Sequence, residues 1–388
     1  MTGFAGHGFA GHGLTIPVLP ESSPARKGEG GGMGEKIGII GAGAWGTALA
    51  KVLAECGHDV VLWANEADVV ASVNASHENS RFLPGVVLPA SLRAVGDPLE
   101  AAIGKDVLIL AVPSPFFMRV AKRILQAPNI MEGESLVAVV TKGFIPTPNG
   151  PRLILDILED HLPGFYRGNT VYVSGPSHAE EVSRGRLTGL AAACANPRNA
   201  IRVRGLFKGS RVLVFPSLDT TGVQVCGATK NVVAIAFGML DAMKEDSTQD
   251  EFGDNTESLL LAAGLNEMQS LGIALGASHP ETFSSLAGVG DLDVTCRSVH
   301  GRNRRFGREI VGKDILAPFA DHDDLLARIG ELGYLPEGAV AAKEVSIFAE
   351  RLGLGLPIMG GVARILDRKI SPRAFLGNFL EGLGASIG

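Results

Sequence analysis

Lys230 is the residue of this sequence whose surroundings most clearly suggest chemistry. It lies in the run 223–236, V-Q-V-C-G-A-T-K-N-V-V-A-I-A, in which almost every other side chain is apolar or small. An ammonium group there is costly unless a partner or a function compensates. Desolvation and a nearby cation would both lower its pKa, so that it could donate a proton at neutral pH. A lysine whose charged end simply reaches solvent is the alternative. Asn231 adds a hydrogen-bonding group to the same turn.

Two acids and a threonine follow in a predicted loop of small residues. Asp291, Asp293 and Thr295 stand in the sequence G-V-G-D-L-D-V-T-C, and the next segment, 297–307, is R-S-V-H-G-R-N-R-R-F-G. Several arginines that enter a helix form an anion site, because guanidinium groups and helix N-terminal amides both bind phosphate oxygens. An exposed basic helix face is the alternative, although a net charge of −6 makes this basic cluster local.

Lys142 is a third candidate because of its place after a strand. Residues 107–112 and 136–140 are short apolar runs typical of buried strands, and they are followed by Pro113 and by Lys142. The carboxyl ends of strands in an open parallel sheet line the ligand crevice, so Lys142 is expected to face a substrate or cofactor. A solvated loop lysine is the alternative. His178 is a further candidate to line this crevice, without a catalytic role.

A glycine-rich turn predicts that the crevice binds the pyrophosphate of a dinucleotide. Residues 41–46 are G-A-G-A-W-G, directly after an apolar strand and before a predicted helix. Gly41 permits the tight turn, Gly43 lets the backbone approach a pyrophosphate, and Gly46 allows close packing of helix on strand. The N-terminus of the helix supplies free N–H donors. A glycine turn without a ligand is the alternative.

The residue that should select the cofactor is ambiguous. The predicted strand 59–63 is followed by Ala64, Asn65 and Glu66. A strict NAD site often has an aspartate where Asn65 stands, and an arginine nearby would favour NADP. Asn65 is neutral, no arginine follows immediately, and Glu66 also suits the start of a helix. The sequence therefore leaves NAD and NADP open.

The order of the elements predicts the fold class. Apolar strands alternate with helices up to Pro216, and helices dominate afterwards, so we predict an α/β chain with two domains. A Rossmann-type, doubly wound parallel sheet is expected at 35–216, and an all-α domain for substrate and catalysis at 217–388. Residues 1–34, rich in glycine, are expected to be a flexible tail. The predicted strands are 36–41, 59–63, 107–112, 136–140, 170–173, 190–193 and 212–215, and the predicted helices are 47–56, 116–125, 152–162, 222–243, 259–275, 302–311, 339–352 and 361–367.

Composition excludes several classes of protein. The chain has 388 residues, of which 46% are hydrophobic and 20% charged, as in globular proteins. Its four cysteines show no C-x-x-C spacing, which excludes a disulfide scaffold and a zinc ribbon and fits a reducing cytosol. The negative net charge argues against a generally nucleic-acid-binding surface. No metal site is expected, and no apolar run reaches the roughly 18 residues of a membrane span.

Seven motifs together resemble a known family. They are G-A-G-A-W-G-T-A-L-A at 41–50, F-L-P-G at 82–85, V-P-S at 112–114, T-K-G at 141–143, S-G-P-S-H-A-E-E at 174–181, G-A-T-K-N at 227–231 and G-R-N-R-R-F-G at 301–307. In this order they look like the NAD(P)-dependent sn-glycerol-3-phosphate dehydrogenases, particularly the bacterial ones, from about residue 36 to about residue 357. The resemblance implies a C-terminal domain like that of 6-phosphogluconate dehydrogenase. It also implies reversible reduction of dihydroxyacetone phosphate to glycerol 3-phosphate for glycerophospholipid synthesis, by a cytoplasmic homodimer.

The resemblance also implies roles for the matching residues. Lys230 would be the general acid/base, with Lys142 and Asp291 as further catalytic residues. The implied substrate-binding residues are Lys142, Gly175, Ser177, Lys230, Asn231, Asp291, Thr295, Gly301, Arg302 and Asn303. The implied cofactor-binding residues are Gly41, Gly43, Ala44, Trp45, Gly46, Asn65, Pro113, Lys142, Ala179, Arg302, Leu335 and Glu337.

One segment departs from the family's pattern. The family usually has a lysine or arginine soon after an Asp-Asn pair and an arginine just before the next Gly-Leu. Here Glu257 and Ala262 or Ala263 replace those cations. The change weakens the positive field expected near the substrate domain. Two alternatives therefore stay open: a paralogue that acts on another phosphorylated ketone, and a cofactor-binding sensor without catalysis.

Overall fold

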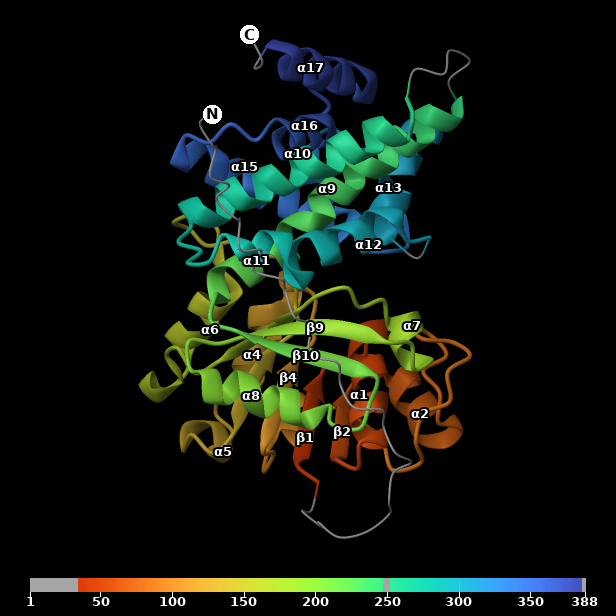
Figure 1. Cartoon of the computed structure of the whole chain (residues 1–388). Coiled ribbons are helices and arrows are strands. Elements are labelled where there is room, and N and C mark those ends of the chain that lie inside the picture. Colours follow the sequence, from red (N-terminus) through yellow and green to blue (C-terminus); the bar gives the residue numbers. More distant parts are fainter. Residues whose placement is uncertain (1–33, 247–251, 300, 386–388) are drawn as a thin grey trace, which may run out of the picture. The chain divides into compact units, whose positions relative to one another are not determined.

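The computed structural model describes residues 34–246, 252–299 and 301–385 (Figure 1). The predicted tail, apart from Gly34, lies outside the described residues. The last strand of the sheet ends at Ser217 and the next helix begins at Thr220. Gly34–Gly388 form one compact unit by their contacts. The division of this unit at residue 216 therefore stays a prediction.

Eight strands form one sheet in the order β10-β9-β8-β5-β4-β1-β2-β3. The order β3-β2-β1-β4-β5-β8 within it is that of the doubly wound dinucleotide-binding fold, so the predicted fold class is confirmed. All neighbouring strands are parallel except β8 and β9, which are antiparallel, so the sheet is mixed rather than wholly parallel. The strands are β1 (Lys36–Ile40), β2 (Asp59–Trp63), β3 (Arg93–Val95), β4 (Val107–Leu110), β5 (Leu136–Val139), β8 (Val171–Ser174), β9 (Thr188–Ala193) and β10 (Val212–Ser217).

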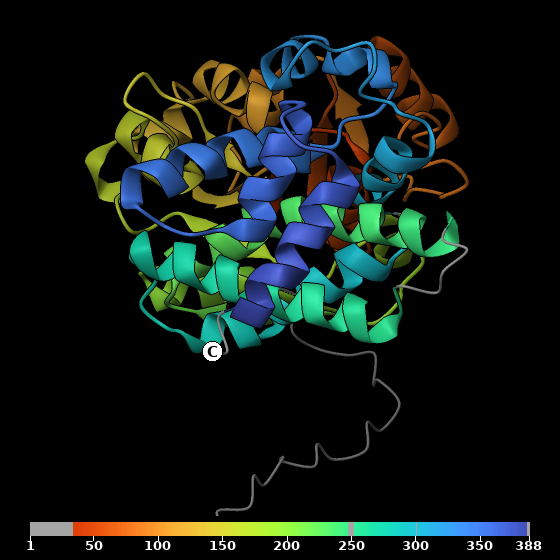
Figure 2. The same cartoon turned by 90° about the horizontal axis from the view of Figure 1, so that it is seen from above.

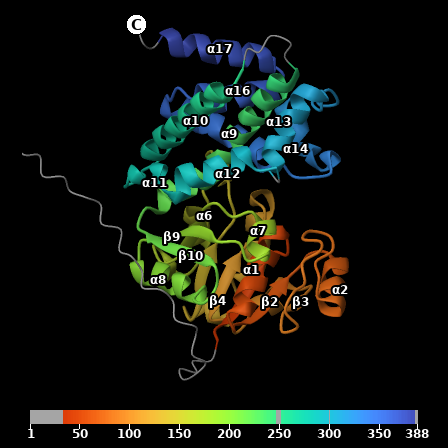
Figure 3. The same ribbon diagram turned by 45° about the vertical axis from the view of Figure 1, so that its right-hand side comes forward.

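Helices cover both faces of the sheet, which explains why its strands are continuous apolar runs. Ile37 and Ile39 of β1 pack toward one set of helices, and Ile40 belongs to the core on the opposite face. On the first face α7 packs beside α1 (Figure 3). The first face carries α1 (Ala44–Glu55), α2 (Ala67–Ser76), α7 (Ala179–Ser183) and α8 (Pro197–Leu206), and the second carries α3 (Pro98–Ala102), α4 (Phe117–Ile124), α5 (Pro128–Met131) and α6 (Ile154–His161).

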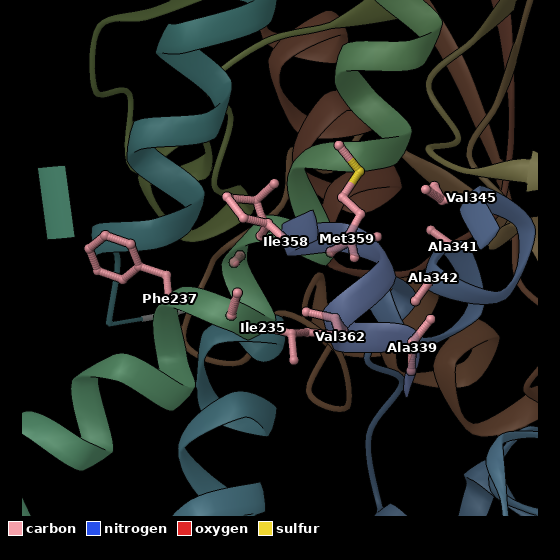
Figure 4. Packing of buried hydrophobic residues seen from close by; sticks show 14 of the residues in the cluster. Ile235, Phe237, Ala339, Ala341, Ala342, Val345, Ile358, Met359 and Val362 are labelled. Atoms are coloured by element: carbon pink, nitrogen blue, oxygen red, sulfur yellow. The ribbon is translucent and has the colours of Figure 1, made fainter. Parts of the chain in front are cut away.

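The second half of the described chain is helical and is built around α9. Ile235 and Phe237 of α9 belong to the same buried hydrophobic cluster as Ala342 of α15 and as Ile358 and Met359 of α16 (Figure 4). Seen from above, the blue C-terminal helices lie against the green and teal helices of residues 220–274 (Figure 2). The helices are α9 (Thr220–Asp246), α10 (Asp254–Ala274), α11 (Glu281–Ser284), α12 (Asp291–Arg297), α13 (Arg302–Gly312), α14 (His322–Ala327), α15 (Glu337–Leu352), α16 (Pro357–Leu366) and α17 (Pro372–Ala385).

Helix α9 is apolar enough to change one expectation. Among the described helices it could span a membrane by length and composition alone, with a mean hydropathy of 1.4, although no such stretch was expected. The apolar window is wholly buried within the protein. Its apolar residues are therefore accounted for by packing against the surrounding helices.

The predicted loop at residues 288–296 is wrong. The chain forms a π-helical turn, η3 (Leu286–Gly290), and then the helix α12. A Cβ on Gly288 would lie 2.0 Å from the carbonyl oxygen of Phe283, so glycine permits this close approach. Asp291 and Asp293 occupy the first turn of α12, where the helix dipole favours acids. Local sequence also missed the two-residue strands β6 (Phe144–Ile145) and β7 (Arg152–Leu153), which pair as an antiparallel hairpin.

Candidate active site

Two lysines and one aspartate from three distant segments meet in the interior. Lys142 follows β5, Lys230 lies on α9 and Asp291 begins α12. The Nζ of Lys142 is 2.8 Å from Oδ2 of Asp291, and Lys230 donates to Oδ1 of the same carboxylate. Lys230 also donates to the hydroxyl of Thr295 at 2.8 Å. The structure therefore brings together four of the residues singled out from the sequence.

The surroundings hold the carboxylate of Asp291 ionised and keep it oriented. Asp291 is completely buried, and Ser174 donates to its Oδ2 at 3.2 Å. Thr295 donates to the backbone carbonyl of Asp291 at 2.6 Å, which fixes the hydroxyl that receives Lys230. Burial raises the pKa of Asp291, but the charges and hydrogen bonds of Lys142 and Lys230 outweigh it, so the pKa is lowered.

Lys230 is poised to change its protonation state near neutral pH. Burial is the largest effect and lowers its pKa, and the positive charge of Lys142 lowers it further. Asp291 acts in the opposite direction, and the resulting pKa is about 7. The cluster thus places two lysine amino groups around one carboxylate, with Lys230 and Asp291 buried and Lys142 partly exposed. A developing negative charge would be stabilised there.

The turn after β8 lies beside Lys142. The Nζ of Lys142 is 3.5 Å from the carbonyl oxygen of Gly175, and the hydroxyl of Ser177 donates to the same carbonyl at 2.8 Å. Gly175 has a φ of +145°, and a Cβ there would lie 2.8 Å from the carbonyl oxygen of Gly189. Asn231 is buried next to Lys230 on α9. All of these residues were predicted for the substrate site. Gly175 contacts Lys142 and Ser177 contacts Gly175, whereas Asn231 follows Lys230 in the chain.

Sequence reasoning missed Tyr172. Its side chain is wholly buried, and its hydroxyl has no hydrogen-bond partner in the described part of the chain. A Cβ on Gly227 would lie 3.0 Å from this hydroxyl and 3.0 Å from the hydroxyl of Ser174. Burial, together with the charge of Asp291, raises the pKa of Tyr172. The available signal was the two-residue spacing from Ser174, which places both side chains on one face of β8.

The predicted arginine cluster is mostly neutralised. Of the arginines at residues 297–308, Arg302 alone has no ion pair with any residue that the structure describes, and it is exposed at the first position of α13. Its neighbour Asn303 is buried and accepts from the N–H of Gly338 at 2.8 Å, and Gly301 is the N-cap of α13. The paired arginines are Arg297 with Asp293, Arg304 and Arg308 with Asp241, and Arg305 with Glu309.

The departure at Glu257 is balanced by nearby cations. Glu257 is buried, and its carboxylate lies 3.0 Å from the Nζ of Lys244 and 3.5 Å from the guanidinium of Arg297. Ala262 is exposed and Ala263 is half-buried. The negative charge that replaces a family cation therefore does not stand unpaired. This weakens the argument for a different substrate.

The glycine loop fits a pyrophosphate. Gly41 has a φ of +127°, and a Cβ on Gly46 would lie 1.9 Å from the carbonyl oxygen of Gly41, so neither position admits a side chain. A Cβ on Gly43 would meet no heavy atom within 4 Å, so this side of the loop is open. Gly43 is the N-cap of α1 without a side-chain cap, which leaves the amides of Ala44 and Trp45 free of helix partners.

The other predicted cofactor residues lie on separate elements, and no described hydrogen bond joins them to Asp291. Asn65 is exposed after β2, and Glu66 is the N-cap of α2. Pro113 is the N-cap of a short 3₁₀ helix (Ser114–Phe116), and Ala179 is the buried first residue of α7. Leu335 and Glu337 are half-buried at the start of α15, and the charge of Glu337 contributes to the raised pKa of Tyr172.

Comparisons with known proteins identify the family of the chain. Residues 36–200 match the model of the NAD-dependent glycerol-3-phosphate dehydrogenase N-terminus, and residues 219–377 match that of its C-terminus. A glycerol-3-phosphate dehydrogenase [NAD(P)+] of Treponema denticola is 52% identical over 356 residues, which are 90% of this chain and 99% of that protein. An enzyme of the same name from Lysinibacillus sphaericus is 35% identical over 87% of this chain and 94% of its own length.

A solved structure gives the same result. The glycerol-3-phosphate dehydrogenase of Coxiella burnetii superposes with a TM-score of 0.75 and 31% sequence identity, over 90% of this chain and all of that one. The two family models together match most of the chain from residue 36 to residue 377. The chain therefore belongs to the NAD-dependent glycerol-3-phosphate dehydrogenase family.

Proposed function

We propose that the protein reversibly reduces dihydroxyacetone phosphate to sn-glycerol 3-phosphate with NAD(P)H, as the names of its relatives indicate. The observation that carries the proposal is the buried cluster in which Lys142 and Lys230 share the carboxylate of Asp291. A carbonyl that is reduced there would find a positive environment and a proton donor together.

Lys230 acts as the general acid in reduction and as the general base in oxidation. When bound, NAD(P)H would supply the hydride that the carbonyl carbon of the substrate receives. The carbonyl oxygen then takes a proton from the Nζ of Lys230, and solvent restores the ammonium. Asp291 and Thr295 hold Lys230 in place, since each hydrogen-bonds its Nζ. Lys142 adds a second positive charge that favours the developing alkoxide.

The phosphate of the substrate binds at the start of α13. Arg302 supplies a guanidinium group that no described residue neutralises, and the N-terminus of α13 adds amide donors. Asn303 ties this end of α13 to Gly338 and so fixes its position. Gly175, Ser177, Asn231 and Gly301 complete the proposed substrate site.

The cofactor binds across the glycine loop. The amides of Ala44, Trp45 and Gly46 receive the pyrophosphate, and Gly43 leaves room for it. Asn65, Pro113, Lys142, Ala179, Arg302, Leu335 and Glu337 are the further proposed cofactor contacts. Either NAD or NADP serves as cofactor.

The proposal extends to the setting of the enzyme. We propose a homodimer in the cytoplasm that supplies glycerol 3-phosphate for glycerophospholipid synthesis, with a cofactor domain at 35–216 and a substrate domain at 217–388. All four cysteines are free thiols in the structure, which is compatible with a reducing compartment. Light scattering during size-exclusion chromatography tests the dimer: a mass near twice the chain's 40.4 kDa is expected, and a monomer contradicts it.

A cofactor-oxidation assay tests the reaction. The purified protein is mixed with NADH or NADPH and with dihydroxyacetone phosphate, dihydroxyacetone or glyceraldehyde 3-phosphate. Dihydroxyacetone phosphate should give the highest kcat/KM. A higher kcat/KM with a different phosphorylated ketone would support the paralogue instead. Stoichiometric NADH binding without turnover of any of these compounds would support the sensor.

A further inference from the structure

One buried asparagine connects the F-L-P-G motif of residues 82–85 to the glycine loop. Asn79 is completely buried. Its amide nitrogen donates to the carbonyl of Ala42 and to the hydroxyl of Thr47, both at 2.8 Å. Its amide oxygen accepts from the N–H of Phe82 at 3.0 Å. The side chain therefore uses both of its N–H donors on the glycine loop and the helix that follows it.

These hydrogen bonds determine which way a peptide unit of the loop faces. Thr47 donates to the Ala42 carbonyl as well, at 3.2 Å, so that oxygen is held on the buried side. In a trans peptide the carbonyl and the following N–H point in opposite directions, and the described residues contain no cis peptide bond. The N–H of Gly43 therefore points away from Asn79. A Cβ on Gly43 would meet no heavy atom within 4 Å, so the loop is open where a ligand must approach.

The segment that carries Asn79 is braced by its own hydrogen bonds. Glu78 and Val87 form an antiparallel bridge, and the side chain of Glu78 accepts from the N–H of Gly85 at 2.8 Å. The carbonyl of Asn79 accepts from the N–H of Leu83 at 2.9 Å. The position of Asn79 is thus set by its own turn, and the glycine loop is held against it.

We propose that Asn79 is a positioning residue for dinucleotide binding. It holds the Ala42 carbonyl inward and thereby aims the N–H of Gly43 at the pyrophosphate. The inference rests on the proposed function in that it takes a dinucleotide as the ligand. The side chain of Asn79 has its described hydrogen bonds with Ala42, Thr47 and Phe82 and not with the lysine cluster, so its effect falls on cofactor affinity and not on the chemical step.

Titration of NADH fluorescence with the full chain tests this role. Asn79→Ala removes one hydrogen bond to the glycine loop and one to Thr47 of α1, and it should raise the Kd for NADH about 10-fold or more. At saturating NADH, kcat and the KM for dihydroxyacetone phosphate should stay within about threefold of the wild type. A purely structural role would lower the melting temperature without separating these quantities.

Asn129 offers a matched control. It is a buried asparagine whose amide donates to the carbonyls of Ala102 and Lys105, which precede β4 and so lie at the amino end of the strands, away from the glycine loop at the carboxyl end of β1. Asn129→Ala should lower stability comparably and leave the Kd for NADH unchanged. A folded Asn79→Ala variant with a Kd within about twofold of the wild type would overturn the proposal, as would an equal rise in Asn129→Ala.

A second variant decides the question if Asn79→Ala does not fold. Thr47→Val keeps the shape of the side chain and removes the hydroxyl that binds Asn79 and the Ala42 carbonyl. A rise in Kd of about threefold or more is expected, and an unchanged Kd contradicts the proposal. Binding is measured without a ketone, so a wild type that binds NADH but does not reduce dihydroxyacetone phosphate would refute the proposed function alone.

Discussion

The protonation of Lys230 should control the direction of the reaction. Burial, with a smaller contribution from Lys142, lowers the pKa of Lys230 to about 7. Reduction needs the ammonium form and oxidation needs the amine. The kcat for reduction should therefore fall as the pH rises above about 7, while the kcat for glycerol 3-phosphate oxidation rises. Initial rates at saturating substrates across roughly pH 6 to 9 measure this, and two flat profiles would contradict it.

Replacing Lys230 tests its role directly. Lys230→Met removes the proton donor and keeps an apolar side chain of similar length in α9. We expect kcat to fall by about 10²-fold or more, with the Kd for NADH close to that of the wild type. Steady-state kinetics and NADH titration measure the two quantities. Near-normal turnover would instead assign the acid role to Lys142.

Arg302 should determine the preference for a phosphorylated ketone. Each hydrogen bond to a charged group contributes roughly 1.5–3 kcal/mol, so two or three should favour dihydroxyacetone phosphate over dihydroxyacetone by about 10³-fold in kcat/KM. In Arg302→Ala this ratio should shrink, mainly through lost activity on the phosphorylated ketone. The Kd for NADH is measured in parallel. A wild type that reduces both ketones equally, or a variant that loses NADH affinity alone, would refute the assignment.

At the scale of elements, two buried glutamates should affect stability in opposite ways. Glu344 of α15 has an Oε2 without a partner among the described residues, and burial raises its pKa to about 7. The protonated form is favoured in the native state, so this stabilisation is complete below the ordinary value of 4.5 and is lost as the pH rises through about 7. Glu344→Gln mimics the protonated form and should raise Tm by roughly 2 °C or more at about pH 8, and by less at about pH 5.

Glu267 of α10 is the matched control for that change. Its two carboxylate oxygens accept from the N–H groups of Ile358 and Met359 in the first turn of α16, at 2.6 and 2.9 Å. Glu267→Gln replaces one acceptor with a donor that faces an N–H group, so Tm should fall at the same pH. Thermal unfolding of both variants measures the contrast. A fall in Tm for Glu344→Gln at about pH 8 would contradict the interpretation of its unpaired oxygen.

An element can be predicted from the sequence when its own residues form a clear pattern. The strand β2 is observed at its predicted residues, and α9 differs from its predicted range by a few residues at each end. The side chains of β2 and α9 are mostly buried, so an apolar run in the local sequence is enough to predict each of them. Helix α12 was predicted as a loop, because its glycine-rich start gives no helical periodicity. Its course depends on the contact between Gly288 and Phe283.

At the scale of the whole molecule, the N-terminal segment should be dispensable. The family match begins at residue 36, and Glu35 is held by an ion pair with Arg202 and by hydrogen bonds of its backbone with His58 and Asp59. A chain that begins at Gly34 should keep its melting temperature and its kcat nearly unchanged, because residues 1–33 are rich in glycine and lack apolar periodicity. Thermal unfolding and the NADH assay check this, and a large loss of either would show that the segment docks on the folded part.

The sequence by itself determined the order of the elements, the glycine loop and the unusual placement of Lys230, since each is written in consecutive residues. Only the tertiary structure determined which side chains pair with one another in ion pairs and hydrogen bonds. Asp291 bonds Lys142, 149 residues away, and Lys230, 61 residues away. It also decided that Arg302 stays unpaired among its arginine neighbours within the described chain, and that Asn79 supports the glycine loop. Ion pairs and buried hydrogen bonds depend on which elements pack together. The local periodicity of a sequence does not show which distant elements those are.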